Sequence, residues 1–443
     1  MNTSDILKQL KKRKVIFLIL LSTVVFHCFS QDTIFIDPGF PKEQFQNGTM
    51  NNPYSSWQMV KFVPGITYLQ KRNTTDTVDH INLKESFVCI GAYGEGDKPV
   101  VYCKTQFNKH GVSSSKNNNI SIKNLEILAP DGMSCIYLST GNQNFLIDSC
   151  ILHNSEWGIR ITSGGNSNHK ILNSEIHSTM DDGIFIQDAI NLEIGNCHIY
   201  DVNLKWESPQ TPEIKAPGDG IQLSRCDNWH VHGNIIDRRR NGNKFCFISN
   251  NPNQTKGVFE RNILYSPSIK GSCVFMGSGS GIIIRYNKFI GNGATFAIYH
   301  HVNNLKVYYN TFERFSKGIV SLNDSACRII NNTFYDVERG VSGVNILSIN
   351  NIFDNAKKMQ VPYIKVDKLV EYNNHYTRNY NGNSSTTGNP EFVQNGEEKF
   401  QLGKSSPCIN KGILQEFKTD MAGNRIPCNY LPDIGAYEYC GAE

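Results

Sequence analysis

Carboxylates and a lysine stand at matching positions in successive segments of this chain. Asp182, Asp219 and Lys244 each lie two residues before the first inward aliphatic residue expected of a strand, and Asp181 adds a third carboxylate. If the segments stack as strands, neighbours in this column lie about 4.8 Å apart. Stacked carboxylates repel, so they need a shared proton, a cation or a nearby basic side chain. One Asp-Gly pair could simply turn the chain into a strand, but the whole set favours a functional site.

Two reactions fit these residue types. In a uronate lyase, Lys244 would remove the proton beside the sugar carboxylate, and Arg238, Arg239 or Arg240 would help to neutralise that carboxylate. Asp182 and Asp219 would then hold a hard cation such as Ca²⁺ through oxygen ligands. In a glycoside hydrolase, the same two aspartates would act as acid and base, with a water between them in the inverting case.

Residues around this column could bind a sugar. Aromatic faces can stack on pyranose rings, and basic groups can bind a uronate carboxylate. The longest insertion in the chain, residues 201–217, should form a loop beside the column, because insertions in stacked repeats collect on one face. A neutral, tolerated insertion is the alternative. The candidate substrate-binding residues are Asp181, Trp157, Arg160, Phe185, Lys205, Trp206 and Lys215.

The elements that must position these residues repeat along the sequence. Segments such as NHKILNSEI from Asn168 and NLKVYYNTF from Asn304 carry an apolar anchor, and the anchors recur in steps of 22 to 28 residues with a single step of 37. A second strand of the pattern x-Gly-apolar-x-apolar follows in each unit. A fixed period of this size predicts stacked units that share one core. Their alternating pattern indicates strands, so the sequence predicts a parallel β-solenoid. The anchors are Ile122, Ile147, Ile171, Ile194, Val231, Phe259, Ile284, Val307 and Ile329.

Asparagine recurs three residues after each of the later anchors. Asparagine tolerates the left-handed conformation of a tight corner. A fixed offset predicts that these side chains stack in one column and bond to one another, which an asparagine-rich composition alone does not explain. The column comprises Asn234, Asn262, Asn287, Asn310, Asn332 and Asn351.

With these repeats, the chain resembles the right-handed parallel β-helix proteins of the pectin-lyase-like group over about residues 110–355. The resemblance implies an all-β, right-handed, single-stranded parallel β-helix. It also implies a site at the strand-start column, where polygalacturonase-like hydrolases carry catalytic aspartates, and Asp182 and Asp219 match that placement. The Gly-His-Gly and Arg-x-Lys motifs of those hydrolases are absent, and Lys244 stands in the expected histidine column, which favours the lyase.

The first thirty residues read as an export signal. Basic residues from Lys8 to Lys14 precede the apolar run Val15 to Phe26, and Cys28-Phe29-Ser30 is a plausible cleavage site before Gln31. An uncleaved anchor is the alternative. Of 44 basic and 40 acidic residues, five and one fall in residues 1–30, which leaves 39 of each. The neutral balance argues against nucleic acid as a partner.

We therefore divide the chain into a signal peptide (1–30), an N-terminal cap with the first coils (31–110), the β-helix repeats (111–355) and a C-terminal cap segment (356–443). A short helix after Asn52, with Ser55 or Ser56 at its N-cap, should close the first end, because open sheet ends need covering. Most cysteines read as small buried residues. Cys428 and Cys440 are the best disulfide candidates.

We expect a protein that is secreted, periplasmic or on the cell surface, and that is monomeric with no stable membrane insertion after cleavage of the signal. Its partner should be a polysaccharide, which a lyase-type enzyme would cleave. A polygalacturonase-like inverting hydrolase and a non-catalytic glycan-binding protein remain the alternatives, because a fold alone does not fix a function.

Overall fold

The protein was analysed as a computed structural model. The structure describes residues 32–104, 109–203, 218–240, 245–252, 256–266, 271–293, 295–354, 368–377, 384–393 and 399–441. The predicted signal segment lies outside these ranges, as do Lys205, Trp206, Lys215 and Lys244.

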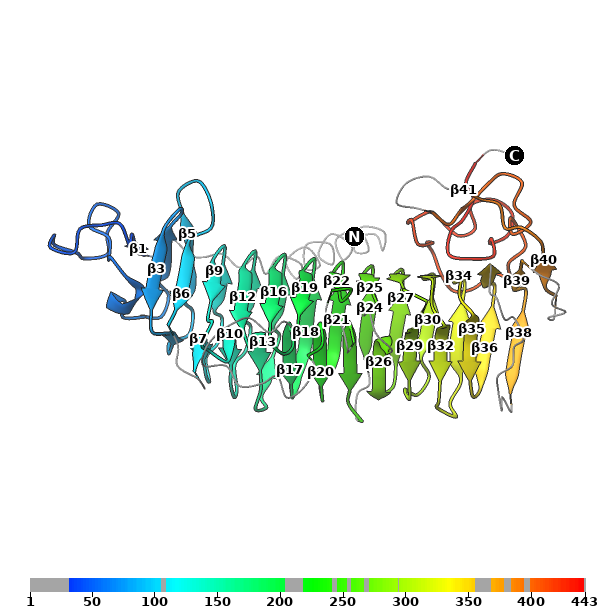
Figure 1. Cartoon of the computed structure of the whole chain (residues 1–443), viewed down its shortest axis with the longest axis horizontal. Helices are drawn as coiled ribbons and strands as arrows, with labels where there is room; N and C mark the ends of the chain where they lie inside the picture. Colours follow the sequence, from blue (N-terminus) through cyan, green and yellow to red (C-terminus); the bar gives the residue numbers. More distant parts are fainter. Residues whose placement is uncertain are drawn as a thin grey trace, which may run out of the picture.

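Three long parallel sheets form an elongated solenoid (Figure 1). Each coil contributes one strand to sheet A, then one to sheet B and one to sheet C, as β11, β12 and β13 show. Within the described residues, sheet C has 11 strands and therefore about as many complete coils. The prediction of stacked, strand-built repeats is confirmed.

The strands of sheet A are β1 (Thr33–Ile36), β2 (Thr67–Lys71), β5 (Cys89–Tyr93), β8 (Ser121–Lys123), β11 (Leu146–Asp148), β14 (Asn166–Ser167), β15 (Lys170–Leu172), β18 (Ala189–Gly195), β21 (Asp227–His232), β24 (Gly257–Glu260), β27 (Ile282–Arg285), β30 (Lys306–Tyr308), β33 (Cys327–Ile330), β36 (Ile346–Ile349) and β38 (Leu369–Tyr372). Those of sheet B are β3 (Thr75–Val78), β6 (Val100–Cys103), β9 (Glu126–Leu128), β12 (Ile151–Ser155), β16 (Glu175–Thr179), β19 (His198–Val202), β22 (Ile235–Asp237), β25 (Ile263–Tyr265), β28 (Lys288–Ile290), β31 (Thr311–Glu313), β34 (Thr333–Tyr335), β37 (Ile352–Asp354), β39 (His375–Tyr376) and β40 (Thr386–Thr387). Those of sheet C are β4 (Ile81–Leu83), β7 (His110–Ser114), β10 (Ser134–Leu138), β13 (Trp157–Ile161), β17 (Ile184–Gln187), β20 (Ile221–Ser224), β23 (Phe247–Asn250), β26 (Ser272–Ser278), β29 (Phe296–His300), β32 (Lys317–Ser321) and β35 (Arg339–Gly343). The strands β41 (Phe392–Val393) and β42 (Gln401–Leu402) form a separate antiparallel pair.

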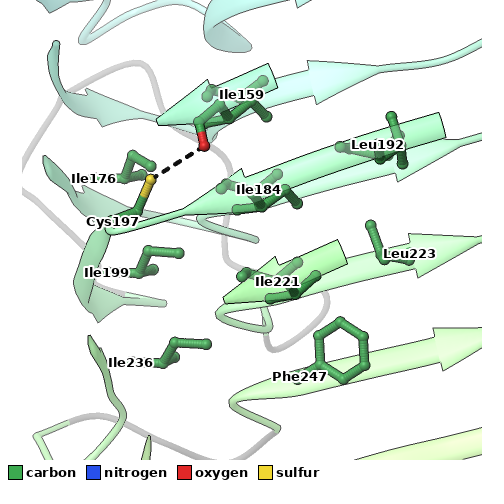
Figure 2. Close-up of a cluster of buried hydrophobic side chains, with 14 of the residues drawn as sticks. Ile159, Ile176, Ile184, Leu192, Cys197, Ile199, Ile221, Leu223, Ile236 and Phe247 are labelled. Atoms are coloured by element: carbon green, nitrogen blue, oxygen red, sulfur yellow. Dashed lines mark hydrogen bonds between the residues drawn. The ribbon is translucent and has the colours of Figure 1, made fainter. Parts of the chain in front are cut away.

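The core is a set of apolar columns that run along the solenoid axis. Ile159 pairs in register with Ile184, Ile184 with Ile221 and Ile221 with Phe247, and all four side chains are fully buried (Figure 2). Each coil therefore buries its aliphatic face against the coils above and below it. This packing explains why a strict repeat is needed, since no coil could bury that surface alone.

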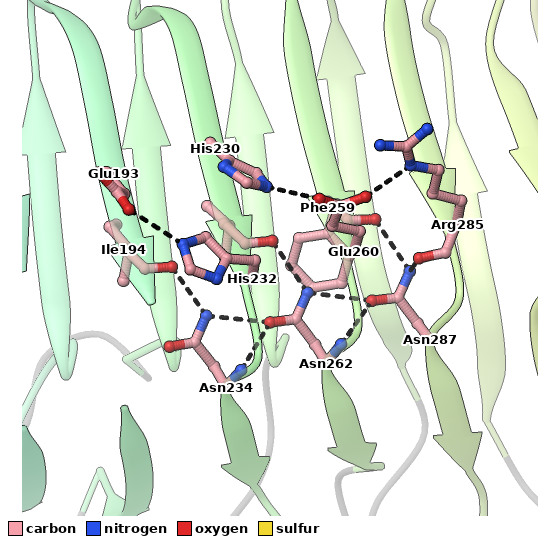
Figure 3. Close-up of polar contacts among 11 residues, drawn as sticks. Glu193, Ile194, His230, His232, Asn234, Phe259, Glu260, Asn262, Arg285 and Asn287 are labelled. Carbon is pink, nitrogen blue, oxygen red and sulfur yellow. Dashed lines mark hydrogen bonds and ion pairs between the residues drawn. The ribbon is translucent and has the colours of Figure 1, made fainter. Parts of the chain in front are cut away.

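The corner between sheets A and B carries the asparagine column. The Nδ2 group of Asn234 donates to Asn262 Oδ1 at 2.9 Å, and that of Asn262 donates to Asn287 Oδ1 at 3.0 Å (Figure 3). The same bond continues through Asn310, Asn332 and Asn351 to Asn374. These side chains are almost completely buried, so the corner is held by polar groups that satisfy one another.

The predicted N-terminal cap helix is wrong. The described residues of this region contain only a three-residue 3₁₀ turn, η1 (Trp57–Met59), whose N-cap Ser56 accepts a hydrogen bond from the Gln58 N–H. A turn this short satisfies too few backbone groups to extend into an α-helix, and Val60 already has an extended backbone. Trp57 instead anchors the segment, because its ring nitrogen donates to the buried side chain of Gln70 at 2.6 Å.

The C-terminal segment packs against the last coils of sheet A. Phe400, Met421 and Tyr437 share an apolar cluster with Tyr309 and Ile330 of the solenoid, and the segment lies beside those coils in Figure 1. Cys428 and Cys440 form a disulfide, as the sequence predicted. Across the described ranges, no helix is long and apolar enough to cross a membrane.

Candidate active site

The strand-start column of sheet C brings the two predicted aspartates together. The register pairs Ile184 with Ile221, so Asp182 and Asp219 occupy neighbouring rungs. Asp182 Oδ1 accepts the Asp219 N–H at 2.6 Å, and Asp219 Oδ1 accepts the Phe245 N–H at 2.8 Å. Each carboxylate therefore caps the backbone of the next coil.

Both of these carboxylates are buried, with exposed fractions of 3% for Asp182 and 5% for Asp219. Burial, together with the charges of Asp181 and Asp219, raises the pKa of Asp182 well above its ordinary range. Neutralising one member of the pair by a proton removes the repulsion expected from the sequence.

Arg238 is buried beside this pair rather than presented to solvent. It is 1% exposed, and its guanidinium donates to the backbone carbonyls of Val202 at 2.8 Å and Gly218 at 2.6 Å. Burial lowers the pKa of Arg238, while the charges of Asp219 and Asp182 oppose that change. These bonds join the backbone before residue 204 to the backbone after residue 217, so Arg238 supports the structure of the site.

The predicted place of Lys244 in the column is wrong. The register pairs Ile221 with Phe247, which gives the position beside Asp219 to Phe245. Lys244 lies two residues before Cys246, but Cys246 occupies the column of small residues that Gly183 and Gly220 hold in the preceding coils. A Cβ atom on Gly220 would lie 2.5 Å from the Cys246 carbonyl oxygen, which explains why that column needs small residues.

The more exposed part of the site lies on the rungs of Trp157 and Asp182. Glu156 and Asp181 are neighbours in register, one residue before Trp157 and Asp182, and both are half-buried. Burial and the nearby Asp181 charge raise the pKa of Glu156 to about 7, although Arg160 opposes the shift. A carboxyl group that titrates near neutral pH can donate and recover a proton.

Arg160 lies among aromatic rings on the outer face of sheet C. Its Cζ atom is 4.3 Å from the Trp157 ring centre and 5.8 Å from that of Tyr137. Its Nε atom is buried and has no hydrogen-bond partner among the described residues. The predicted substrate-binding residues Trp157, Arg160, Phe185 and Asp181 therefore share one face, with Phe185 on the rung after Arg160.

A row of aromatic side chains continues this face toward the C-terminus. Phe245 stacks on Phe275 with ring centres 5.1 Å apart, and Phe275 stacks on Tyr299 at 5.8 Å. Phe296 lies 6.3 Å from Tyr299, and all four rings are half-buried. Sequence reasoning missed this aromatic row (Phe245, Phe275, Phe296 and Tyr299), and it missed Glu156. Extending the Arg160–Phe185 column along the later strands would have found Phe275 and Tyr299.

The calcium site expected at Asp182 and Asp219 has few ligands to offer. Calcium takes six to eight oxygen ligands, whereas each of these carboxylates already gives one oxygen to a backbone N–H. Within the described residues, no group of three or more His, Cys, Asp or Glu side chains could hold a metal ion. We therefore assign no chemical step to calcium, and its binding stays a prediction.

Comparisons with known proteins agree with the architecture. A family model described as "Right handed beta helix region" matches residues 67–236. No curated protein matches the sequence significantly. Together with the solved structures below, the match shows that the chain has a right-handed parallel β-helix fold.

Two solved structures support this similarity in fold, and a third aligns at a lower TM-score. XylC in complex with xylose aligns with a TM-score of 0.57 and 11% identity, over 92% of this chain and 98% of that one. A PL6-family alginate lyase aligns with a TM-score of 0.51 and 13% identity, over 78% of this chain and 53% of that one. The A-module of a mannuronan C-5 epimerase from Azotobacter vinelandii aligns with a TM-score of 0.49 and 11% identity, over 72% and 88%.

Proposed function

We propose that this protein is an exported carbohydrate-active enzyme that cleaves a uronic-acid-containing polysaccharide bound along the outer face of sheet C. The observation that carries the proposal is the juxtaposition of Arg160, held between aromatic rings, with Glu156, whose pKa is raised to about 7. The guanidinium offers a donor to a sugar carboxylate, and the rings offer faces for sugar stacking. The aromatic row extends that surface over several coils.

Hydrolysis is the reaction that the described residues support best. Glu156 in its protonated form would donate a proton to the glycosidic oxygen, and ionised Asp181 would attack the sugar or activate a water. The two residues lie on adjacent coils whose backbones are about 4.8 Å apart, so both carboxyl groups can act on one sugar ring. Asp182 and Asp219, the pair first expected to do this chemistry, would instead hold the backbone beneath it.

β-Elimination is the second candidate, because the Arg160 guanidinium lies on this face over the Trp157 and Tyr137 rings. In that reaction Arg160 would neutralise the uronate carboxylate and so acidify the neighbouring C–H group. Lys244, which directly precedes Phe245 in the sequence, would remove that proton in its neutral form. The C–O bond to the glycosidic oxygen would break as the C=C bond forms, and the leaving oxygen would take up a proton from water. The fold similarity to an alginate lyase and to a xylose-bound protein agrees with a sugar ligand and does not distinguish the two reactions.

One experiment separates these reactions. The mature protein is incubated with alginate, polygalacturonate, xylan and other polysaccharides, and both reducing ends and the absorbance of unsaturated products are followed. Hydrolysis predicts reducing ends without absorbance, with loss of activity in Glu156→Gln and Asp181→Asn and retention in Lys244→Ala. New absorbance that disappears in Lys244→Ala would establish elimination instead. Binding without either product would refute both reactions and leave a glycan-binding protein.

A further inference from the structure

A polar groove of about 510 Å³ lies on the outer face of sheet A, away from the strand-start column of sheet C. It crosses β15, β18, β21, β24 and β27. The residues that line it are Asn168, His169, Lys170, Asn191, Leu192, Glu193, Asn228, Trp229, His230, Val258, Glu260 and Arg285. We call it the sheet A groove.

The charges of the sheet A groove are matched in pairs. Glu193 accepts from Lys170 Nζ at 2.7 Å. Glu260 contacts Arg285 Nε at 2.5 Å and His230 Nε2 at 2.8 Å (Figure 3). Burial alone would raise the pKa values of both glutamates, but the bonds from these basic groups hold them below their ordinary range. Two ionised carboxylates and two permanent cations leave no net charge, so the groove suits an uncharged polar ligand.

One edge of the groove is a row of side-chain amides. Asn191 Nδ2 donates to Asn168 Oδ1 at 2.8 Å, and Asn228 Nδ2 donates to Asn191 Oδ1 at 2.6 Å. All three residues have left-handed backbones, with φ between 50° and 57°, so the turn fixes where each amide lies. Each amide uses one N–H within the row and keeps a second N–H for a ligand. The row therefore repeats a donor about every 4.8 Å along the axis.

Two residues of the groove lining, Trp229 and His169, have buried side chains. The Trp229 Nε1 and His169 Nε2 atoms are buried and have no partner among the described residues. His169 Nδ1 accepts the Phe145 N–H at 3.3 Å, so the neutral ring carries its hydrogen on Nε2. Trp229 packs on Phe247 and His169 on Phe145, so both rings lie behind the groove and do not count among its ligand donors.

We propose that the sheet A groove is a second carbohydrate-binding site, which takes an uncharged stretch of a glycan chain. The argument is the combination of a groove without net charge and an exposed amide row with regular spacing along the axis, whose spare N–H groups can donate to oxygen acceptors. A glycan presents hydroxyl oxygens at regular intervals along its length and carries no charge that the paired glutamates would repel. The site stands apart from the Glu156–Asp181 face and does not depend on the reaction proposed there.

The test is affinity electrophoresis of the mature protein in gels that contain xylan, mixed-linkage β-glucan or alginate. The parent should be retarded by at least one uncharged glycan. Asn191→Gly removes the central amide and keeps the left-handed turn, so retardation should weaken about threefold to tenfold. Asn144→Gly is the control, because Asn144 has a similar φ (55° against 57°) and the same kind of ladder bond, yet does not line the groove. It removes the acceptor of Asn168 Nδ2 but leaves all three groove amides in place. Arg285→Gln provides a second groove variant.

The outcomes separate this inference from the proposed function. Groove variants should lose retardation and keep polysaccharide cleavage, whereas Phe275→Ala in the aromatic row should lose cleavage and keep retardation by the uncharged glycan. Equal retardation of Asn191→Gly, Arg285→Gln and Asn144→Gly would overturn the groove assignment. Absence of retardation of the parent by every uncharged glycan would also overturn it, whatever the cleavage assay shows.

Discussion

Replacing Asn287 with leucine tests whether the asparagine column holds the solenoid together. Asn287 is fully buried, and its Nδ2 donates to Phe259 O, Arg285 O and Asn310 Oδ1, each at 2.9 Å. Its Oδ1 accepts the backbone N–H of Asn262 at 2.9 Å and the Asn262 Nδ2 at 3.0 Å. Leucine has a similar shape but can make none of these bonds.

The expected loss follows from the groups left behind. Asn262 Nδ2 keeps a second acceptor, Val231 O, whereas the Asn262 backbone N–H loses the Asn287 oxygen. One orphaned buried donor costs about 1–3 kcal/mol, and the remaining lost bonds add about 1 kcal/mol. We therefore expect Asn287→Leu to lower the free energy of unfolding by about 2–4 kcal/mol.

Urea denaturation measures this loss as a shift in midpoint at unchanged slope. Asn303→Leu is the control, because Asn303 is exposed and lies outside the column, so its change should stay within about 0.5 kcal/mol. Equal midpoints for the parent, Asn287→Leu and Asn303→Leu would refute the reasoning and would mean that the amide column contributes little to stability.

Three further predictions concern other parts of the chain. Burial raises the pKa of Glu438 to about 8 and that of Asp433 to about 6, so the folded state keeps protons that the unfolded state has lost. The free energy of unfolding should therefore fall as pH rises from about 4.5 to 8 and then level off. A urea midpoint that rises over this pH window would contradict the assignment. Gly220→Ala should lower the free energy of unfolding by about 1–3 kcal/mol, because the alanine Cβ would lie 2.5 Å from the Cys246 carbonyl oxygen. A melting temperature equal to that of the parent would show that the coil adjusts without cost. Exported protein should begin near Gln31 by N-terminal sequencing, whereas a retained Met1 would indicate an uncleaved anchor.

The sequence by itself determined the architecture, because a solenoid repeats one local pattern. The apolar anchors recur at nearly constant steps, and each anchor pairs in register with the next, as Ile147 does with Ile171. The offset of three residues also placed Asn234, Asn262 and Asn287 in one column. Periodicity specifies these features because each position meets the same position one coil later, and no distant contact is needed to fix it.

Features that depend on the exact strand register or on the burial of a side chain could not be predicted in the same way. Cys246 occupies a column held by glycine in the two preceding coils, so a pattern that relied on glycine shifted Lys244 by one position. The same pattern placed Asp182 and Asp219 correctly in register, yet it did not reveal that both carboxylates are buried and bonded to the backbone.

Tertiary structure alone decided which groups are chemically available. The raised pKa of Glu156 arises from partial burial and from Asp181 on the next coil, 25 residues away in sequence. The aromatic row likewise exists only because Phe245, Phe275 and Tyr299 stack across successive coils. A residue's type and spacing follow from the sequence, whereas its exposure, its electrostatic neighbours and therefore its acidity follow from how the coils pack.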